Sequence, residues 1–157
     1  MQAIQDTYPT ELGQCYGCGK DNPHGLQLKS YEQADGETVA RFMPAPHHTA
    51  IPGFVYGGLI ASLIDCHATG TASAAAYRAA GRKPGTPPYL RFVTASLCVD
   101  YLAPTPIGVE LELHGRAVEV KARKVVVEVD LSALGVCCAR GRIVAVLMPE
   151  AMAPRPA

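Results

Sequence analysis

One acidic side chain lies within an otherwise apolar segment, and its carboxylate is the first candidate for chemistry. Asp65 is the only aspartate or glutamate between Glu37 and Asp100, and its neighbours are small or hydrophobic. Removing an unpaired carboxylate from water costs several kcal/mol. Chains that keep such a group often use it as a general base or a nucleophile. We therefore take Asp65 as the first candidate catalytic residue.

Two glycines, Gly57 and Gly58, open the same segment. Residues 57 to about 80 are typical of one long helix that ends at Gly81. A helix N-terminus carries free N–H groups, which can bind an anion or a developing oxyanion. Gly58 and Asp65 are seven residues apart, which is about 10 Å along the axis at roughly 1.5 Å per residue.

One helix is therefore unable to bring both groups to within roughly 3 Å of a single carbonyl. Two antiparallel copies can do so if a two-fold axis places the helix start of one subunit opposite Asp65 of the other. The spacing thus predicts a homodimer with two composite sites. On a helical wheel, small and polar residues share the face that we expect to meet the partner, namely Gly58, Ser62, Asp65 and Thr69. The apolar face, expected to cover a sheet, consists of Leu59, Ile60, Leu63 and Ile64.

Charge and hydropathy exclude several classes of partner. Fourteen basic residues balance fourteen acidic ones, so no nucleic-acid partner is expected. No apolar run is long enough to cross a bilayer, so no membrane partner is expected. Residues 1–6 lack the basic start and apolar stretch of a signal peptide, which favours a cytoplasmic location.

Six cysteines could suggest a metal site or disulfides. Cys15 and Cys18 form a C-x-x-C pair, Cys66 and Cys98 lie in apolar segments, and the remaining two are adjacent. A second pair at zinc-site spacing is missing. A cytoplasmic chain is also a poor candidate for a disulfide framework. We therefore expect no metal, and we interpret most of these thiols as small buried hydrophobic side chains.

The chain is interpreted as a single α+β domain spanning residues 1–157, in which the long helix packs on an antiparallel sheet of five or six strands. Residues 1–25 form a lead-in rich in turn formers, and residues 149–157 are expected to be a flexible tail. Strand-like alternation is found in residues 26–31, 37–42, 92–102, 109–120, 124–131 and 136–148.

Four stretches together resemble a known family. They are residues 15–19 (CYGCG), 22–26 (NPHGL), 52–65 (PGFVYGGLIASLID) and 99–104 (VDYLAP). In this order they resemble the hotdog-fold acyl-CoA thioesterases of the phenylacetate-degradation type, and the resemblance spans residues 14–148. It implies a hotdog fold and hydrolysis of an acyl- or aryl-CoA thioester by a homodimer, which can pair further into a homotetramer. Coenzyme A is needed only as part of the substrate, without a metal or another cofactor.

The resemblance also implies residue roles. Asp65 would be the nucleophile or general base, the Gly57 amide would polarise the thioester oxygen beside Gly58, and Thr94 would position water or the carboxylate. Basic groups suit the phosphates of coenzyme A, with Arg140 and Arg142 as further helpers. The residues expected to contact substrate are His48, Tyr56, Arg91, Arg123 and Lys124.

Two positions depart from the family pattern. Tyr56 stands where the family has a histidine before the double glycine, and Ala50 stands where some relatives have an asparagine. A phenol does not reproduce both ring nitrogens of histidine. The departures favour, as an alternative, a non-catalytic protein that binds or senses acyl-CoA in the same pocket. A hotdog hydratase ranks last, because the helix offers no suitable histidine–aspartate pair.

Overall fold

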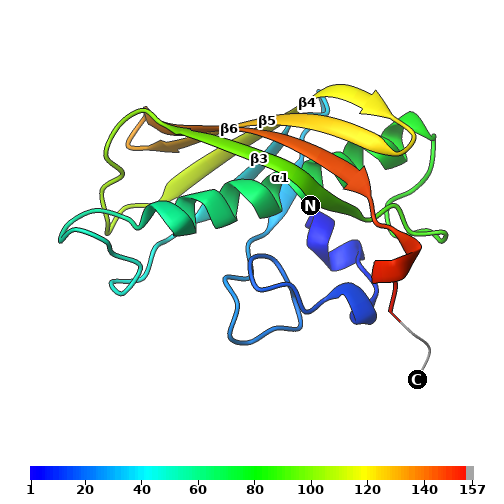
Figure 1. The fold of residues 1–157 in the computed structure, drawn as a ribbon, viewed down its shortest axis with the longest axis horizontal. Coiled ribbons are helices and arrows are strands. Elements are labelled where there is room, and N and C mark those ends of the chain that lie inside the picture. The colour runs from blue at the N-terminus through cyan, green and yellow to red at the C-terminus, as the bar shows by residue number, and fades with distance from the viewer. Residues whose placement is uncertain (155–157) are drawn as a thin grey trace.

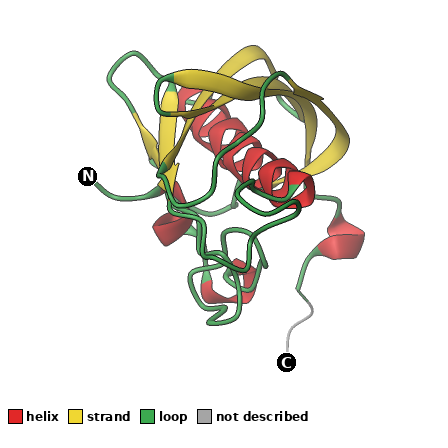
Figure 2. Cartoon of the chain, turned by 90° about the vertical axis from the view of Figure 1, so that its left-hand side faces the viewer, coloured by secondary structure: helices red, strands yellow, loops and turns green. Residues whose placement is uncertain are grey.

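One long helix, α1, lies across the inner face of a curved six-stranded antiparallel sheet (Figures 1 and 2). The structure is a computed structural model that describes residues 1–154. The elements are the 3-10 helices η1 (Ile4–Thr7), η2 (Thr10–Leu12) and η3 (Glu150–Met152), the helix α1 (Gly57–Ala79), and the strands β1 (Ser30–Glu32), β2 (Thr38–Phe42), β3 (Phe92–Tyr101), β4 (Leu111–Lys121), β5 (Lys124–Ala133) and β6 (Val136–Leu147). The strand order is β1-β2-β4-β5-β6-β3. The α+β hotdog prediction is confirmed, with six strands.

None of the helices in residues 1–154 has the length and hydrophobicity needed to span a bilayer.

The apolar face predicted for the first half of α1 packs against the sheet. Its four residues, Leu59, Ile60, Leu63 and Ile64, are all buried. Gly141 of β6 permits this close packing, since a Cβ atom there would lie 2.3 Å from Cγ2 of Ile64. The contact between helix and sheet therefore depends on a position without a side chain.

The second half of α1 is covered on the side away from the sheet as well. Every residue from Cys66 to Tyr77 is buried, because the lead-in lies against that side of the helix (Figure 1). Gln5 of the lead-in lies close to Gly70, where a Cβ atom would be 3.1 Å from Nε2 of Gln5. Thr69, expected on the open face, is buried, so that expectation was wrong for this residue.

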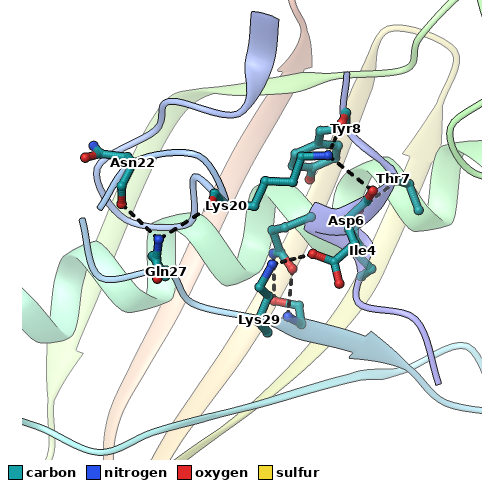
Figure 3. A network of polar contacts seen from close by, with 10 residues as sticks. Ile4, Asp6, Thr7, Tyr8, Lys20, Asn22, Gln27 and Lys29 are labelled. Atoms are coloured by element: carbon teal, nitrogen blue, oxygen red, sulfur yellow. Dashed lines mark hydrogen bonds and ion pairs between the residues drawn. The ribbon is translucent and has the colours of Figure 1, made fainter. Parts of the chain in front are cut away.

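Polar contacts fix the lead-in to the rest of the molecule (Figure 3). The ammonium of Lys20 donates a 2.9 Å hydrogen bond to the backbone oxygen of Tyr8. Lys29, just before β1, forms an ion pair with Asp6. The lead-in thus packs as an ordered layer across α1 from the sheet.

Most strand boundaries differ from the sequence prediction by one or two residues, and three segments differ in ways that matter for the fold. The strand expected at 26–31 is paired only from Ser30 onward, because Gln27 has a φ of 52° and the Leu28 amide donates to the Gly17 oxygen of the lead-in instead. The strand expected from residue 109 begins at Leu111, after Gly108 at a φ of 84°. Within the predicted tail 149–157, residues 150–152 form η3, and residues 155–157 lie outside the described part.

Candidate active site

Asp65 and Thr94 form the polar centre of the candidate site. Asp65 projects from the third turn of α1 and is half-buried, and Thr94 lies near the start of β3. The hydroxyl of Thr94 donates a short hydrogen bond to Oδ1 of Asp65. The register of β3 against β6 shifts between Thr94 and Ser96, which is the signature of a β-bulge, a feature that re-aims side chains near functional sites.

The surroundings of Asp65 change its acidity. Burial raises the pKa of its carboxyl above the ordinary value, the hydrogen bond from Thr94 and the charge of Arg91 oppose this shift, and a charge on Cys15 adds to it. A carboxylate with a raised pKa is a better proton acceptor, and the neighbouring hydroxyl holds it in one orientation. Asp65 can therefore serve as a general base or, by its oxygen, as a nucleophile.

The start of α1 supplies hydrogen-bond donors. Tyr56 is the N-cap residue, and its side chain makes no capping hydrogen bond. The amides of Leu59 and Ile60 donate to the Tyr56 oxygen. The amides of Gly57 and Gly58 have no acceptor within the part of the chain that the structure describes. These N–H groups lie at the N-terminal, positive end of the helix dipole, where they can stabilise an oxyanion.

Two tyrosines flank this helix start. The Tyr101 hydroxyl donates a 2.6 Å hydrogen bond to the Gly57 oxygen. The Tyr56 ring lies over Gly58, where a Cβ atom would be 2.4 Å from Cε1 of Tyr56. Sequence reasoning missed Tyr101 as a site residue, although its stretch 99–104 carried part of the resemblance. The only signal available was its aromatic hydroxyl.

A cavity of about 310 Å³ opens beside the helix start. It is lined mainly by apolar side chains, with Gly57 and Tyr101 at one side; its other lining residues include Phe54, Ile60, Leu102 and Thr105. An apolar cavity with a few converging polar groups is typical of a small-molecule site. The cavity can accept an apolar group whose polar end meets the Gly57 amide.

Within one chain the structure leaves the helix start and Asp65 apart. They lie on the same helix, eight residues from Gly57 to Asp65, which is about 12 Å along the axis. The Asp65 carboxylate accepts a hydrogen bond from Thr94, near the first residue of β3. The Gly57 oxygen at the helix start accepts one from Tyr101, the last residue of β3. A composite site therefore still requires a second copy.

His48 braces the loop before the helix. Its Nδ1 accepts a 3.0 Å hydrogen bond from the Ala45 amide, and its backbone oxygen accepts a 2.9 Å bond from the Tyr56 amide. The ring stacks on Phe42 at 5.8 Å between centroids. Burial, with a contribution from the charge of His47, lowers the pKa of His48. Ala50, in the same loop, is exposed.

The predicted basic residues Arg91, Arg123 and Lys124 lie at the sheet end where β3 begins, whereas Arg140 lies opposite Asp100 near the other end of β3 and forms an ion pair with Asp130. The Leu147 amide donates to the Arg123 oxygen, and the Met148 amide donates to the Arg91 oxygen. Arg123 and Lys124 are exposed or half-exposed at the β4–β5 turn, and Lys124 lies 3.6 Å from Glu119. Their expected contact with coenzyme A phosphates stays a prediction.

Arg91 is placed differently from these two residues. Its guanidinium lies 4.4 Å above the Tyr8 ring and donates to the Tyr8 hydroxyl at 3.3 Å. This packing directs Arg91 toward the lead-in. Its expected contact with coenzyme A stays a prediction.

Comparisons with known proteins agree with this geometry. The profile of the thioesterase superfamily matches residues 52–138, more than half of the chain. The chain belongs to the thioesterase superfamily. The family resemblance proposed from the sequence is thereby confirmed at the level of the superfamily.

Three relatives illustrate the range of similarity within the superfamily. A crystal structure of a thioesterase superfamily protein from Shewanella loihica PV-4 is 58% identical, covers 92% of this chain and 99% of its own, and has a TM-score of 0.70. The acyl-coenzyme A thioesterase THEM4 of Xenopus laevis is 33% identical over 95 residues, which is 60% of this chain but only 37% of that protein. The smu.793 protein of Streptococcus mutans, solved bound to acetyl CoA, is 20% identical with a TM-score of 0.61, over 77% of this chain and 86% of its own, and shares the fold.

Proposed function

We propose that this protein hydrolyses the thioester bond of an acyl- or aryl-coenzyme A. The observation that carries the proposal is the Asp65–Thr94 pair, a half-buried carboxylate oriented by a hydroxyl in a chain of the thioesterase superfamily. The similarity to an acyl-coenzyme A thioesterase supports the choice of substrate class.

The reaction follows from the two groups at the ends of the site. Asp65 accepts a proton from water while the water oxygen bonds to the thioester carbon. The carbonyl oxygen becomes an oxyanion, which the Gly57 amide stabilises, a contribution of about 3 kcal/mol for one donor. The intermediate collapses, the carbon–sulfur bond breaks, and the departing thiolate takes up a proton. In the variant with Asp65 as nucleophile, its oxygen bonds to the thioester carbon, the carbon–sulfur bond breaks and coenzyme A leaves as a thiolate that takes up a proton; water then hydrolyses the mixed anhydride to the acid and regenerates the Asp65 carboxylate.

A homodimer supplies both groups to one substrate. Strand β3 lies at the edge of the sheet, and its residues 94–98 are all exposed, so both of its faces are open. An unpaired, exposed edge strand is a template for pairing with another chain. Pairing through β3 would bring two α1 helices into antiparallel positions, so that Asp65 of one copy approaches the Gly57 amide of the other. Assembly into a tetramer, through sheets or through helices, and the cytoplasmic location stay predictions.

Substrate recognition follows from the same arrangement. The acyl or aryl group occupies the apolar cavity beside Gly57, where Tyr56 and the loop carrying His48 form part of the surroundings. The phosphates of coenzyme A contact the exposed basic residues Arg123 and Lys124, because their side chains act as point charges toward phosphate.

The decisive test is hydrolysis of a panel of acyl- and aryl-CoA thioesters by the wild type and by Asp65→Asn. We expect a loss of kcat of at least about a hundredfold with the best substrate, because general-base catalysis alone contributes 10²–10⁴-fold. The control is Asp35→Asn, an exposed turn aspartate whose capping oxygen is kept by asparagine. Equal rates for the wild type and Asp65→Asn would remove Asp65 from the mechanism.

The alternative is a non-catalytic protein that binds acyl-CoA. It is favoured by Tyr56, which replaces the family histidine and makes no capping bond with its side chain. Tight binding of CoA thioesters without turnover across the panel would support it, whereas turnover would exclude it.

A further inference from the structure

Three cysteine thiols converge beside the candidate site. Cys15 and Cys18 come from the lead-in, and Cys66 follows Asp65 on α1. Their sulfur atoms all lie within 4.8 Å of one another, and the Sγ atoms of Cys15 and Cys66 are 3.7 Å apart. Cys18 and Cys66 are buried, whereas Cys15 is only partly covered and leaves a path from solvent. The sequence showed no further ligand at zinc-site spacing for the C-x-x-C pair, whereas the fold brings Cys66 of α1 to it.

The spacing of the sulfurs suits a shared metal ion. Thiolates bind Zn²⁺ at about 2.3 Å, which places sulfurs around one ion about 3.8–4.0 Å apart. The Cys15–Cys66 separation of 3.7 Å is close to that range, and the other two separations are at most 4.8 Å. A disulfide, by contrast, needs sulfurs at about 2.05 Å, and all three cysteines are free thiols.

The loop is shaped to admit the helix sulfur. A Cβ atom on Gly17 would lie 2.3 Å from Sγ of Cys66, so only glycine allows the sulfur to approach between Cys15 and Cys18. The Gly19 amide donates a 2.7 Å hydrogen bond to the Cys15 oxygen and closes the turn. The pair is thus held in a tight turn with the third sulfur against it.

The three thiols differ in acidity, because contacts within the cluster lower the pKa of Cys15 and raise the pKa values of Cys18 and Cys66. Hydrogen bonds from the thiols of Cys18 and Cys66 and from the backbone lower the pKa of Cys15, against the effect of its burial. The hydrogen bond with Cys15 and burial raise the pKa of Cys18, and hydrogen bonds with Cys15 and Cys18 together with burial raise that of Cys66, so a metal ion that binds here displaces protons from these two thiols. The thiolate is the form that ligates metals.

We propose that Cys15, Cys18 and Cys66 bind one thiophilic metal ion, Zn²⁺ or Cu⁺. Thiolate ligands select these soft ions over Mg²⁺ or Ca²⁺. No fourth His, Cys, Asp or Glu joins the cluster among residues 1–154, so the site is three-coordinate, or solvent on the Cys15 side completes it. The bound ion links the lead-in to α1 beside Asp65. This inference does not rest on the proposed activity.

The test uses the full chain, reduced under anaerobic conditions and dialysed against Zn²⁺ or Cu⁺ separately. We expect one ion per chain by elemental analysis. The variants Cys15→Ser, Cys18→Ser and Cys66→Ser should each weaken binding by at least about tenfold. The control Cys137→Ser removes a thiol on β6, outside the cluster, and should bind as the wild type does. The ion is identified as Zn²⁺ or Cu⁺ by which of the two dialyses gives one ion per chain.

A second readout needs no variant. Saturating metal should slow alkylation of Cys15 by at least about tenfold, because the ion holds its thiolate, while Cys137, which lies on β6 outside the cluster, is modified at an unchanged rate. The proposal is overturned if the folded, reduced protein binds neither ion stoichiometrically. Binding that survives both Cys18→Ser and Cys66→Ser, or equal protection of Cys137, overturns it as well.

Discussion

The hydroxyl of Tyr101 donates a 2.6 Å hydrogen bond to the backbone oxygen of Gly57 and ties the last residue of β3 to the first residue of α1. The peptide units at the helix start are thereby held against the strand that carries Thr94 at its other end. The bond fixes the peptide unit that joins Gly57 to Gly58, and so helps to hold the first turn of the helix, whose N-cap residue makes no side-chain capping bond.

Replacing Tyr101 by phenylalanine removes the hydrogen bond and keeps the ring. We expect the free energy of unfolding to fall by about 1 kcal/mol and kcat to fall by several-fold, because the oxyanion donor becomes less well oriented. Chemical denaturation and steady-state hydrolysis measure the two effects. Tyr89→Phe, on an exposed loop tyrosine, is the control, and the tie would be irrelevant to catalysis if both variants had the wild-type kcat.

Gly57 allows its amide to be deleted without breaking the helix. Proline has no N–H and is well tolerated at the first helical position, and Tyr56, at φ −62° and ψ 129°, has the conformation preferred before proline. We expect Gly57→Pro to lower kcat about 10²–10³-fold, the usual effect of removing an oxyanion donor. Circular dichroism should show unchanged helix content.

The matched control for the amide deletion is Gly57→Ala. It keeps the N–H and adds a Cβ atom at an ordinary 3.4 Å from the Tyr101 ring. A Gly57→Pro variant as active as Gly57→Ala would show that this amide does not stabilise the oxyanion.

Thr94 lowers the pKa of Asp65 through its hydrogen bond. Thr94→Val removes the donor with little change of shape, so the pKa of Asp65 rises further. Because Asp65 must be ionised to act, activity is lost as the pH falls through that pKa, and the acid limb of the kcat/KM profile moves to higher pH. Thr94→Ser keeps the hydroxyl and should leave the limb in place. An unchanged profile for Thr94→Val would separate Thr94 from the ionisation of Asp65.

His67 predicts a pH dependence of stability that is separate from catalysis. Burial lowers the pKa of its ring from 6.5 to about 4, and the ring nitrogens lie 2.9 Å from the Ser30 hydroxyl and 3.2 Å from that of Thr38. The unfolded chain binds a proton below pH 6.5, whereas the folded chain does so only near pH 4. The contribution of neutral His67 to the free energy of unfolding is therefore fully present above pH 6.5. About 3 kcal/mol of it is lost as the pH drops toward 4.

Urea unfolding at several pH values checks the role of His67. The variant His67→Gln should lose most of the slope between pH 6.5 and 4, even though its stability at pH 7 is lower. His24→Gln, on an exposed lead-in histidine, serves as the control and should keep the slope. An unaltered slope in His67→Gln would assign the acid sensitivity to other groups.

Local patterns predicted the elements of this fold, and tertiary contacts decided what the patterns missed. The span of α1 followed from residue type and from Gly81, and alternation located the strands. Thr94 was placed beside Asp65 only through the resemblance, because local patterns do not show which residue of α1 a given strand residue will meet. The Tyr101–Gly57 bond joins residues 44 positions apart, and Cys66 meets Cys15 across 51 positions. Thr69 was misplaced because periodicity does not show the lead-in packing over the second half of the helix.

The composite site is tested most directly by mixing two inactive variants. Asp65→Asn and Gly57→Pro are each unfolded, combined in equal amounts and refolded together, so that about half of the dimers are hybrids. In a hybrid, one site carries both defects and the other has an intact Asp65 facing an intact Gly57 amide. We predict that the mixture recovers about a quarter of the wild-type hydrolysis rate, while each variant refolded alone stays inactive. A mixture no more active than its components would contradict a site shared between two subunits.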